Sequence, residues 1–409
     1  MTDELEPLIG TRPAEPYGDV KTRLAAIVEA NRAEILALDH RIHANPEPAY
    51  EEFQASAWVA AAVRAHGFAV EHPAGSLATA VRGRLSGGRS GEAGRSGPRI
   101  GILAEYDALP GLGHGCGHNT MAASGVGAAM ALAAIAPEIN GEIVFLGTPA
   151  EERGSGKQAM LEDGLFDGLD AAILFHPSDI THLACGLLAS EDVHVTFHGF
   201  QAHAAYDPWR GRNALDAMIS LFTSVGLWRQ QLHPADRVHG IIQEGGTAAN
   251  VIPDRTRAWF MLRSPNQDDY RTMRARFEEL CRAAALGADC TVDVEFSGWS
   301  ATMRNNDVLG RRFGANMAAY GIVAGPQPDQ YGSADMGNVS QVLPSVHPQV
   351  AICAAGVPAH SVEFRDLAAL PYADEVTLRM AAVVAQTAYE LFADPELVQA
   401  AWRAFRTGA

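Results

Sequence analysis

Residues 99–136 read RIGILAEYDALPGLGHGCGHNTMAASGVGAAMALAAIA. The apolar run at 99–106 is typical of a buried strand, and the alanine-rich run at 120–136 is typical of a buried helix. The loop between them, 105–119, is rich in glycine and carries the side chains of Cys116 and His118. Because ligands bind at the carboxyl ends of strands in α/β sheets, this loop is the first candidate for a functional site.

Strands and helices alternate on both sides of this stretch. Short β-like runs occur at 78–85, 141–148, 171–175 and 349–354, and apolar residues recur at helical spacing in 19–44, 55–66, 307–320 and 366–392. This alternation predicts an α/β domain with a central mixed sheet flanked by helices.

Residues 190–299 follow a different order of elements. Their pattern predicts strands at 192–198, 238–243, 255–263 and 290–296, with helices at 213–232 and 268–286. The resulting β-α-β-β-α-β order is that of ferredoxin-like α+β domains. Because four strands and two helices can close a core of their own, we expect an inserted domain at 190–299 and a second domain formed by 1–189 and 300–409.

The composition limits the class of protein and its partners. With 409 residues, of which 47% are hydrophobic and 19% charged, the chain is in the range of folded globular proteins. Its net charge of −17 would repel phosphate backbones, so nucleic acid is not an expected partner. The apolar run at 122–136 is too short to span a bilayer, so no membrane is expected either.

Cysteine usage and the first residues indicate the compartment. The five cysteines form an odd, sparse set, so we expect no disulfides and a reducing environment. Residues 1–6, MTDELE, are acidic and lack the apolar segment of a secretory signal, which favours a cytoplasmic location. The glycine- and serine-rich residues 86–98 predict a surface loop.

The loop at 105–119 allows several interpretations. A dinucleotide-binding fingerprint is excluded because Cys116 and His118 stand where it requires glycine. These two residues are instead metal-ligand types, and Gly117 between them would let both converge on one ion. A buried thiol beside a hydrogen-bonded histidine, or a thiol nucleophile with His118 or His114 as its base, remains open.

Potential ligands also follow the other predicted strands. Glu151 and Glu152 come after the strand at 141–148, His176 after 171–175, and His360 after 349–354. Two adjacent carboxylates can point in different directions, so that one binds an ion while the other holds the water beside it. The sequence therefore predicts a metal site to which several strand ends contribute.

Together these segments resemble metallopeptidase family M20, in its amidohydrolase branch (subfamily D). That branch holds aminobenzoyl-glutamate hydrolase subunits, N-acyl-amino-acid amidohydrolases and indole-acetyl-amino-acid hydrolases. The resemblance covers nearly the whole chain. It rests on residues 105–119, Glu151-Glu152, His176, the run GFQAHAA at 199–205, residues 245–253 and His360-Ser361.

The resemblance implies a metal centre and a base. The positions that match the family's metal ligands are Cys116, His118, Glu152, His176 and His360. Glu151 matches the general base, and Asp107 matches a residue that orients the site. Glu105 matches a ligand of other branches and is left out of the set. Asn119 replaces an aspartate of many members, so we expect one or two divalent ions per subunit, of zinc, manganese, cobalt or nickel.

The resemblance also implies roles for the inserted domain. It matches the family's lid and dimerisation domain, so a homodimer is expected. His203 matches a histidine that stabilises the oxyanion, and Asn250 and Arg263 match groups that contact the substrate.

The expected activity is metal-dependent hydrolysis of a small-molecule amide: an N-acyl amino acid, a dipeptide or an aminobenzoyl-glutamate-like compound. A divalent ion lowers the pKa of bound water toward ~7, and Glu151 would take the proton as the water attacks. Two other classes stay open. One is a non-catalytic metal-binding subunit of a hetero-oligomeric amidohydrolase, and the other is a structural zinc protein.

Overall fold

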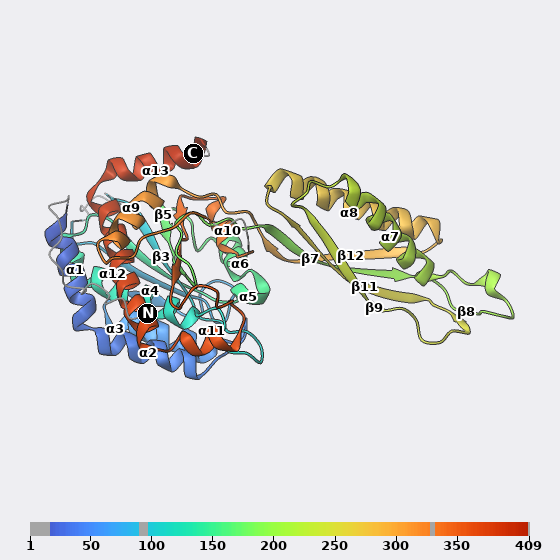
Figure 1. Ribbon diagram of the computed structural model, residues 1–409, viewed down its shortest axis with the longest axis horizontal. Coiled ribbons are helices and arrows are strands. Elements are labelled where there is room, and N and C mark those ends of the chain that lie inside the picture. Colours follow the sequence, from blue (N-terminus) through green and yellow to red (C-terminus); the bar gives the residue numbers. More distant parts are fainter. Residues whose placement is uncertain (1–16, 90–96, 328–331, 408–409) are drawn as a thin grey trace. The chain divides into compact units, whose positions relative to one another are not determined.

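The computed structural model describes residues 17–89, 97–327 and 332–407. The acidic residues 1–6 and the middle of the loop at 86–98 lie outside these ranges. The chain divides into two compact units (Figure 1). The first takes its described residues from Met1–Cys185, Met303–Gln330 and Asn338–Ala409, and the second from Gly186–Thr302 and Tyr331–Gly337.

The first unit is built around a six-stranded mixed sheet. Its strand order is β1-β2-β4-β3-β5-β13, in which β4, β3, β5 and β13 run parallel and β1 and β2 are antiparallel to their neighbours. Strands β6 and β14 form a separate parallel pair. The strands are β1 (Ala69–Glu71), β2 (Val81–Ser86), β3 (Arg99–Glu105), β4 (Glu142–Thr148), β5 (Ala171–Ile173), β6 (His176–Ser178), β13 (Ser345–Val346) and β14 (Gln349–Ala351).

Helices cover this sheet, and α4 is the most deeply buried of them. Every residue from 118 to 132 is buried, and α4 packs against β3, α12, α2 and α1. Because many of its residues are alanine or glycine, these neighbours can approach α4 closely. The helices are α1 (Gly18–Ala30), α2 (Arg32–Ala44), α3 (Phe53–Ala65), α4 (His118–Ala134), α5 (Glu151–Gly154), α6 (Gly156–Glu162), α9 (Asp307–Ala318), α10 (Met336–Ser340), α11 (Val362–Leu367), α12 (Pro371–Ala393) and α13 (Pro395–Thr407).

Two predicted helices are each interrupted in the structure. The span 19–44 forms α1 and α2, because Asn31 leaves helical geometry and its side-chain amide donates to the carbonyl of Ile27. The span 366–392 breaks before Pro371, which begins α12, because a residue that precedes proline is disfavoured in the helical region. The central mixed sheet with flanking helices is confirmed.

The second unit has the predicted β-α-β-β-α-β order. Its antiparallel sheet has the order β12-β7-β11-β9, and α7 and α8 cover one face (Figure 1). Phe260 of β11 lies between Phe222 of α7 and Phe277 of α8, with ring centroids 4.7 and 5.0 Å away. The elements are β7 (Ala189–His198), β8 (Ala202–His203), α7 (Ala214–Trp228), β9 (Arg237–Glu244), β10 (Val251–Ile252), β11 (Arg255–Ser264), α8 (Gln267–Gly287) and β12 (Thr291–Ser300).

The thiols and the apolar helices bear on two further sequence expectations. All five cysteines are free, and three of them, Cys116, Cys185 and Cys281, are buried. Within the described ranges, no helix combines the length and the apolarity that a membrane crossing requires.

Candidate metal centre

The parallel strands bring potential ligands to one edge of the central sheet. Strand β3 ends at Glu105, and the chain reaches Glu151 and Glu152 shortly after β4 ends. His176 follows β5, and His347 follows β13. Because these four strands are parallel, their carboxyl ends meet at the same edge, where α/β sheets bind ligands.

All five predicted metal ligands lie in overlapping clusters at this edge. Within each cluster, one candidate ligand atom per residue lies within 4.8 Å of the others. Shared residues join the clusters, since His118 belongs to two of them and Glu152 to two. The clusters are Cys116–Glu152–His360, His118–Glu151–Glu152 and Glu105–His118–His176.

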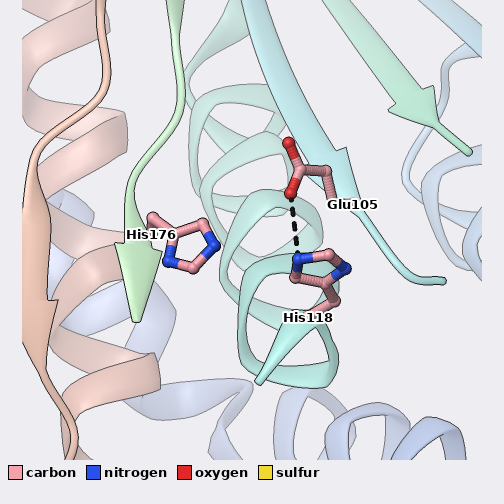
Figure 2. Close-up of side chains that lie close together, drawn as sticks. All are labelled: Glu105, His118 and His176. Carbon is pink, nitrogen blue, oxygen red and sulfur yellow. Dashed lines mark ion pairs between the residues drawn. The ribbon is translucent and has the colours of Figure 1, made fainter. Parts of the chain in front are cut away.

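Gly117 lets the loop bring His118 next to His176. Its φ of 72° is in the left-handed region, and a Cβ there would lie 2.9 Å from Cγ of Pro177. With glycine in this place, His118 begins α4 beside β6, and the rings of His118 and His176 lie 5.7 Å apart. Figure 2 shows both rings beside the carboxylate of Glu105 at the end of β3.

Asp107 orients two of the candidate ligands. Nδ1 of His118 lies 3.0 Å from two oxygens of Asp107, the backbone carbonyl oxygen and Oδ1. Because both oxygens are acceptors, Nδ1 carries the proton. Oδ2 of Asp107 accepts the backbone N–H of Glu152 at 2.9 Å. One buried carboxylate therefore turns Nε2 of His118 toward the cluster and fixes the backbone of Glu152, as is typical of the residues behind metal ligands.

Glu152 lies between two histidines. Its Oε1 is 4.0 Å from Nε2 of His118, and its Oε2 is 3.7 Å from Nε2 of His360. The Glu152 side chain is only 6% exposed, whereas that of His360 is 58% exposed. The cluster is therefore buried on the side of the sheet and open to solvent at His360.

Several buried atoms of the cluster have no hydrogen-bond partner among the described residues. They are Oε2 of Glu105, Nε2 of His118 and Oε1 of Glu152. Oε2 of Glu105 faces Nε2 of His118 at 3.3 Å, and two acceptors at that distance need a proton or a cation between them (Figure 2). The donor set of thiol, imidazole and carboxylate fits a divalent transition metal.

The ionisation of the cluster shows its excess of negative charge. Burial opposes a charged His118, but Asp107, Glu105 and Glu152 outweigh this effect and raise the pKa of His118 well above its usual value. For His176, burial and then the neighbouring charge of His118 lower the pKa to about 4. A bound cation would take the place of the proton on His118.

Sequence reasoning missed the polar groups behind His176. The ligand set that the resemblance implies leaves out Glu105, yet its carboxylate lies in the cluster, with Oε1 2.5 Å from Nζ of Lys157. Burial raises the pKa of Glu105, but Lys157 and the histidines outweigh it and lower the pKa to about 2. The ring of the buried His347 lies 5.6 Å from that of His176. For Glu105 the available signal was its position at the end of the apolar strand β3, whereas Lys157 lies within α6 and His347 follows a strand of two residues.

Two other polar residues of the loop point to different partners. The Asn119 amide donates to Oδ1 of Asp39 at 2.5 Å and to the carbonyl of Ala368 at 3.0 Å. His114 lies next to the carbonyl of Ile42. Neither Asn119 nor His114 therefore contacts the ligand clusters through these bonds.

The geometry weighs against the thiol-nucleophile interpretation. Burial, followed by the nearby charge of Glu152, raises the pKa of the Cys116 thiol well above its usual value. Nucleophilic cysteines have lowered pKa values and exist as thiolates near neutral pH. A metal ion would stabilise the thiolate of Cys116 as a ligand instead.

The remaining predicted residues belong to the second unit. His203 of β8 pairs with Val251 of β10, and the carbonyl of Asn250 accepts the N–H of Ala204, so His203 and Asn250 lie, both exposed, at one small two-stranded antiparallel sheet. Strand β11 begins at Arg255, which pairs with His198, and Arg263 pairs with Ser190 near the other end of the strand. At ~3.3 Å per residue, Arg263 lies roughly 26 Å along the strand from Arg255. The structure brings His203 and Asn250 together but not Arg263 with them.

Comparison with known proteins identifies the family. Residues 101–406 match the family described as Peptidase family M20/M25/M40. The chain belongs to this family. A relative in Mus musculus named Xaa-Arg dipeptidase is 35% identical over 97% of this chain and 96% of its own length. A p-aminobenzoyl-glutamate hydrolase subunit of Escherichia coli is 31% identical over 66% of this chain and 59% of its own length.

A solved structure shows the same M20/M25/M40 fold. It is a dinuclear metal-binding peptidase of the M20 family from Bacillus subtilis, 19% identical, with a TM-score of 0.66 over 88% of this chain and 99% of that one. The predicted family and fold class are thus confirmed. The chain is a hydrolase that acts on amide or peptide bonds.

Proposed function

We propose that this hydrolase cleaves the amide bond of dipeptides and other N-acyl amino acids, with Glu151 as general base. One observation carries the proposal. Donor atoms of the five expected ligands cluster at the carboxyl edge of the sheet, and the carboxylate of Glu151 lies beside His118 and Glu152 within this cluster.

The residues divide the chemistry between them. Cys116, His118, Glu152, His176 and His360 would hold one or two divalent ions, and the position of Glu152 between two histidines supports two. Bound ions supply Lewis-acid chemistry, which lowers the pKa of water and polarises a carbonyl. Glu151 would accept a proton from the attacking water and later donate it to the leaving amine.

The openness of the cluster supports an enzyme over a structural zinc protein. Structural zinc sites are closed by four protein ligands, whereas catalytic sites leave a position for water or substrate. Here the candidate ligand His360 is exposed, and the carboxylate of Glu151 lies next to the candidate ligands His118 and Glu152. A non-catalytic subunit is the other alternative, and it would bind metal without turnover on any substrate.

The relatives favour a dipeptide as substrate. The match to Xaa-Arg dipeptidase spans both proteins almost completely, whereas the match to the p-aminobenzoyl-glutamate hydrolase protein spans about two thirds of this chain. We therefore propose dipeptides with a basic carboxy-terminal residue as the preferred class.

A substrate panel tests this function. Purified protein loaded separately with Zn²⁺, Mn²⁺, Co²⁺ or Ni²⁺ would be assayed with Xaa-Arg and Xaa-Lys dipeptides, neutral dipeptides, N-acetyl amino acids and aminobenzoyl-glutamate. We expect the highest kcat/KM on the basic dipeptides. Turnover of none of these compounds with any metal would contradict the proposal and favour the non-catalytic subunit.

We propose that His203 stabilises the oxyanion. Its Nδ1 accepts the N–H groups of Ala205 and Tyr206 at 3.2 and 3.1 Å, so the proton is on Nε2 and can be donated. Loss of one oxyanion donor typically lowers kcat by about 10²–10³-fold. We expect that loss for His203→Ala, with an unchanged metal content.

A matched control for His203→Ala is His198→Ala. His198 belongs to the same unit, its side chain is partly exposed, and its Nε2 contacts Asp293. We expect kcat to stay within about 2-fold for the control. An unchanged kcat in His203→Ala would remove His203 from the mechanism.

We further propose that the second unit is a lid and dimerisation domain. Strand β9 is an edge strand of its sheet, with no strand on its outer side in the part of the chain that the structure describes, and it exposes Ile241 and Ile242, while α7 exposes Ile219 and Leu227. Exposed apolar side chains on a sheet edge favour pairing with a second copy of the chain. Sedimentation velocity should show a dimer that Ile241→Glu weakens, and a monomer at micromolar concentration would contradict this.

A further inference from the structure

The turn that carries Glu151 and Glu152 is short and has an unfavourable backbone. Helix α5 contains four residues, and the residues on either side of it, Ala150 and Ser155, have positive φ values of 59° and 51°. A residue with a Cβ rarely adopts this conformation unless its surroundings hold it there. The contacts of Ala150 therefore hold the start of this turn, while the bond from the Glu152 N–H to Asp107 holds the turn at Glu152.

Glu52, a buried carboxylate that the proposed mechanism does not use, holds this turn. Its Oε1 accepts the N–H of Ala150 at 2.8 Å and the N–H of Tyr50 at 3.0 Å. Its Oε2 accepts the hydroxyl of Thr79 at 2.8 Å. Glu52 is 0% exposed, so these bonds are shielded from water.

Tyr50 provides a second contact at the other end of the turn. Its hydroxyl donates to the carbonyl of Gly154 at 2.6 Å. A Cβ at Gly154 would lie 2.2 Å from the Tyr50 ring, so only glycine permits this approach. Since Glu52 also holds the N–H of Tyr50, one carboxylate positions both the start of α5 and the residue that contacts its end.

We propose that Glu52 is a positioning residue that fixes the general base Glu151 through the backbone of Ala150. It acts through the reach of its Oε1 and not through its charge. The inference rests on the proposed function of Glu151. A displacement of a catalytic group by about 1 Å can lower the rate by about 10²-fold, so the turn needs such a restraint.

Two conservative variants separate reach from charge. Glu52→Asp keeps the charge but shortens the side chain, so its carboxylate withdraws from Ala150. Glu52→Gln keeps the length, so its carbonyl oxygen still accepts the two N–H groups while its amide donates to Thr79. We expect kcat to fall about 10–100-fold in Glu52→Asp and to stay within about 3-fold in Glu52→Gln. KM and metal content should change little in both.

Thr79→Val is the matched control. It removes the hydroxyl that contacts Glu52 but keeps the shape of the side chain and the bond to Ala150. We expect a lower melting temperature and an unchanged kcat, which separates a loss of stability from a loss of position. Tyr50→Phe removes the contact with Gly154 alone and should lower kcat about 3–10-fold, even if Glu52→Asp does not fold.

The outcomes distinguish this inference from the proposed function. A wild-type chain without amidase activity would overturn both. With an active wild type, full activity in both Glu52→Asp and Tyr50→Phe would overturn the positioning role alone. So would a larger loss of kcat in Glu52→Gln than in Glu52→Asp, because charge would then matter more than reach.

Discussion

Removal of divalent cations is expected to abolish hydrolysis, and their return should restore it. Without a cation, the carboxylates of Glu105, Asp107 and Glu152 lie beside the buried His118, and three buried atoms have no hydrogen-bond partner among the described residues. Dialysis against a chelator should reduce kcat to the background rate. Addition of Zn²⁺, Mn²⁺, Co²⁺ or Ni²⁺ should recover it, and the recovered rates rank these metals as activators.

The same titration should raise the melting temperature. A ligand that binds only the folded state stabilises it by about 2.7 kcal/mol at 100 times its dissociation constant. Differential scanning calorimetry of the chelated and the metal-loaded protein measures this shift. Chelated protein that stays fully active and shows no shift with added metal would contradict a catalytic metal centre.

Substitutions in and around the clusters should lower metal binding to different degrees. His118 belongs to two of the three ligand clusters, so His118→Ala should lose most bound metal by elemental analysis. Asp107→Asn keeps the candidate ligands but disturbs one of the two side-chain bonds of Asp107, either that to Nδ1 of His118 or that to the N–H of Glu152. It should weaken metal affinity or activity about 10–100-fold. His114→Asn, in the same loop but outside the clusters, should keep its metal.

The loop and its flanking elements could be predicted because their signals are contiguous in sequence. Strand β3, the glycine-rich loop and α4 follow one another, and each apolar run is long enough to reveal its periodicity. Strands β1 and β13 contain three and two residues, too few to show alternation. Their places in the sheet depend on pairing with distant strands.

The groups behind the ligands could not be predicted for a related reason. Glu105 lies in the cluster and His347 lies beside His176 because β3, β5 and β13 lie side by side, and this order cannot be derived from local patterns. Glu52 is 98 residues from Ala150 in the chain, and nothing in the sequence around either residue indicates their bond. Residue types and the family resemblance indicate the candidate ligands, whereas tertiary contacts determine what orients them.

Glu151→Gln is expected to remove turnover and leave the metal centre intact. Glutamine has nearly the same shape as glutamate but cannot accept a proton from water near neutral pH. General acid–base catalysis contributes about 10²–10⁴-fold, and Glu151 would act in two proton transfers, so we expect kcat to fall by at least about 10³-fold. Metal content and melting temperature should match the wild type.

The neighbouring variant Glu152→Gln tests whether the two carboxylates have different roles. Glu152 lies in the cluster with Cys116 and His360 as well as in that with His118 and Glu151, so its substitution should release metal. The decisive comparison is metal content against kcat in the two variants. If Glu151→Gln released metal while Glu152→Gln retained it, the two assignments would be exchanged. Near-native kcat in Glu151→Gln would mean that another group accepts the proton.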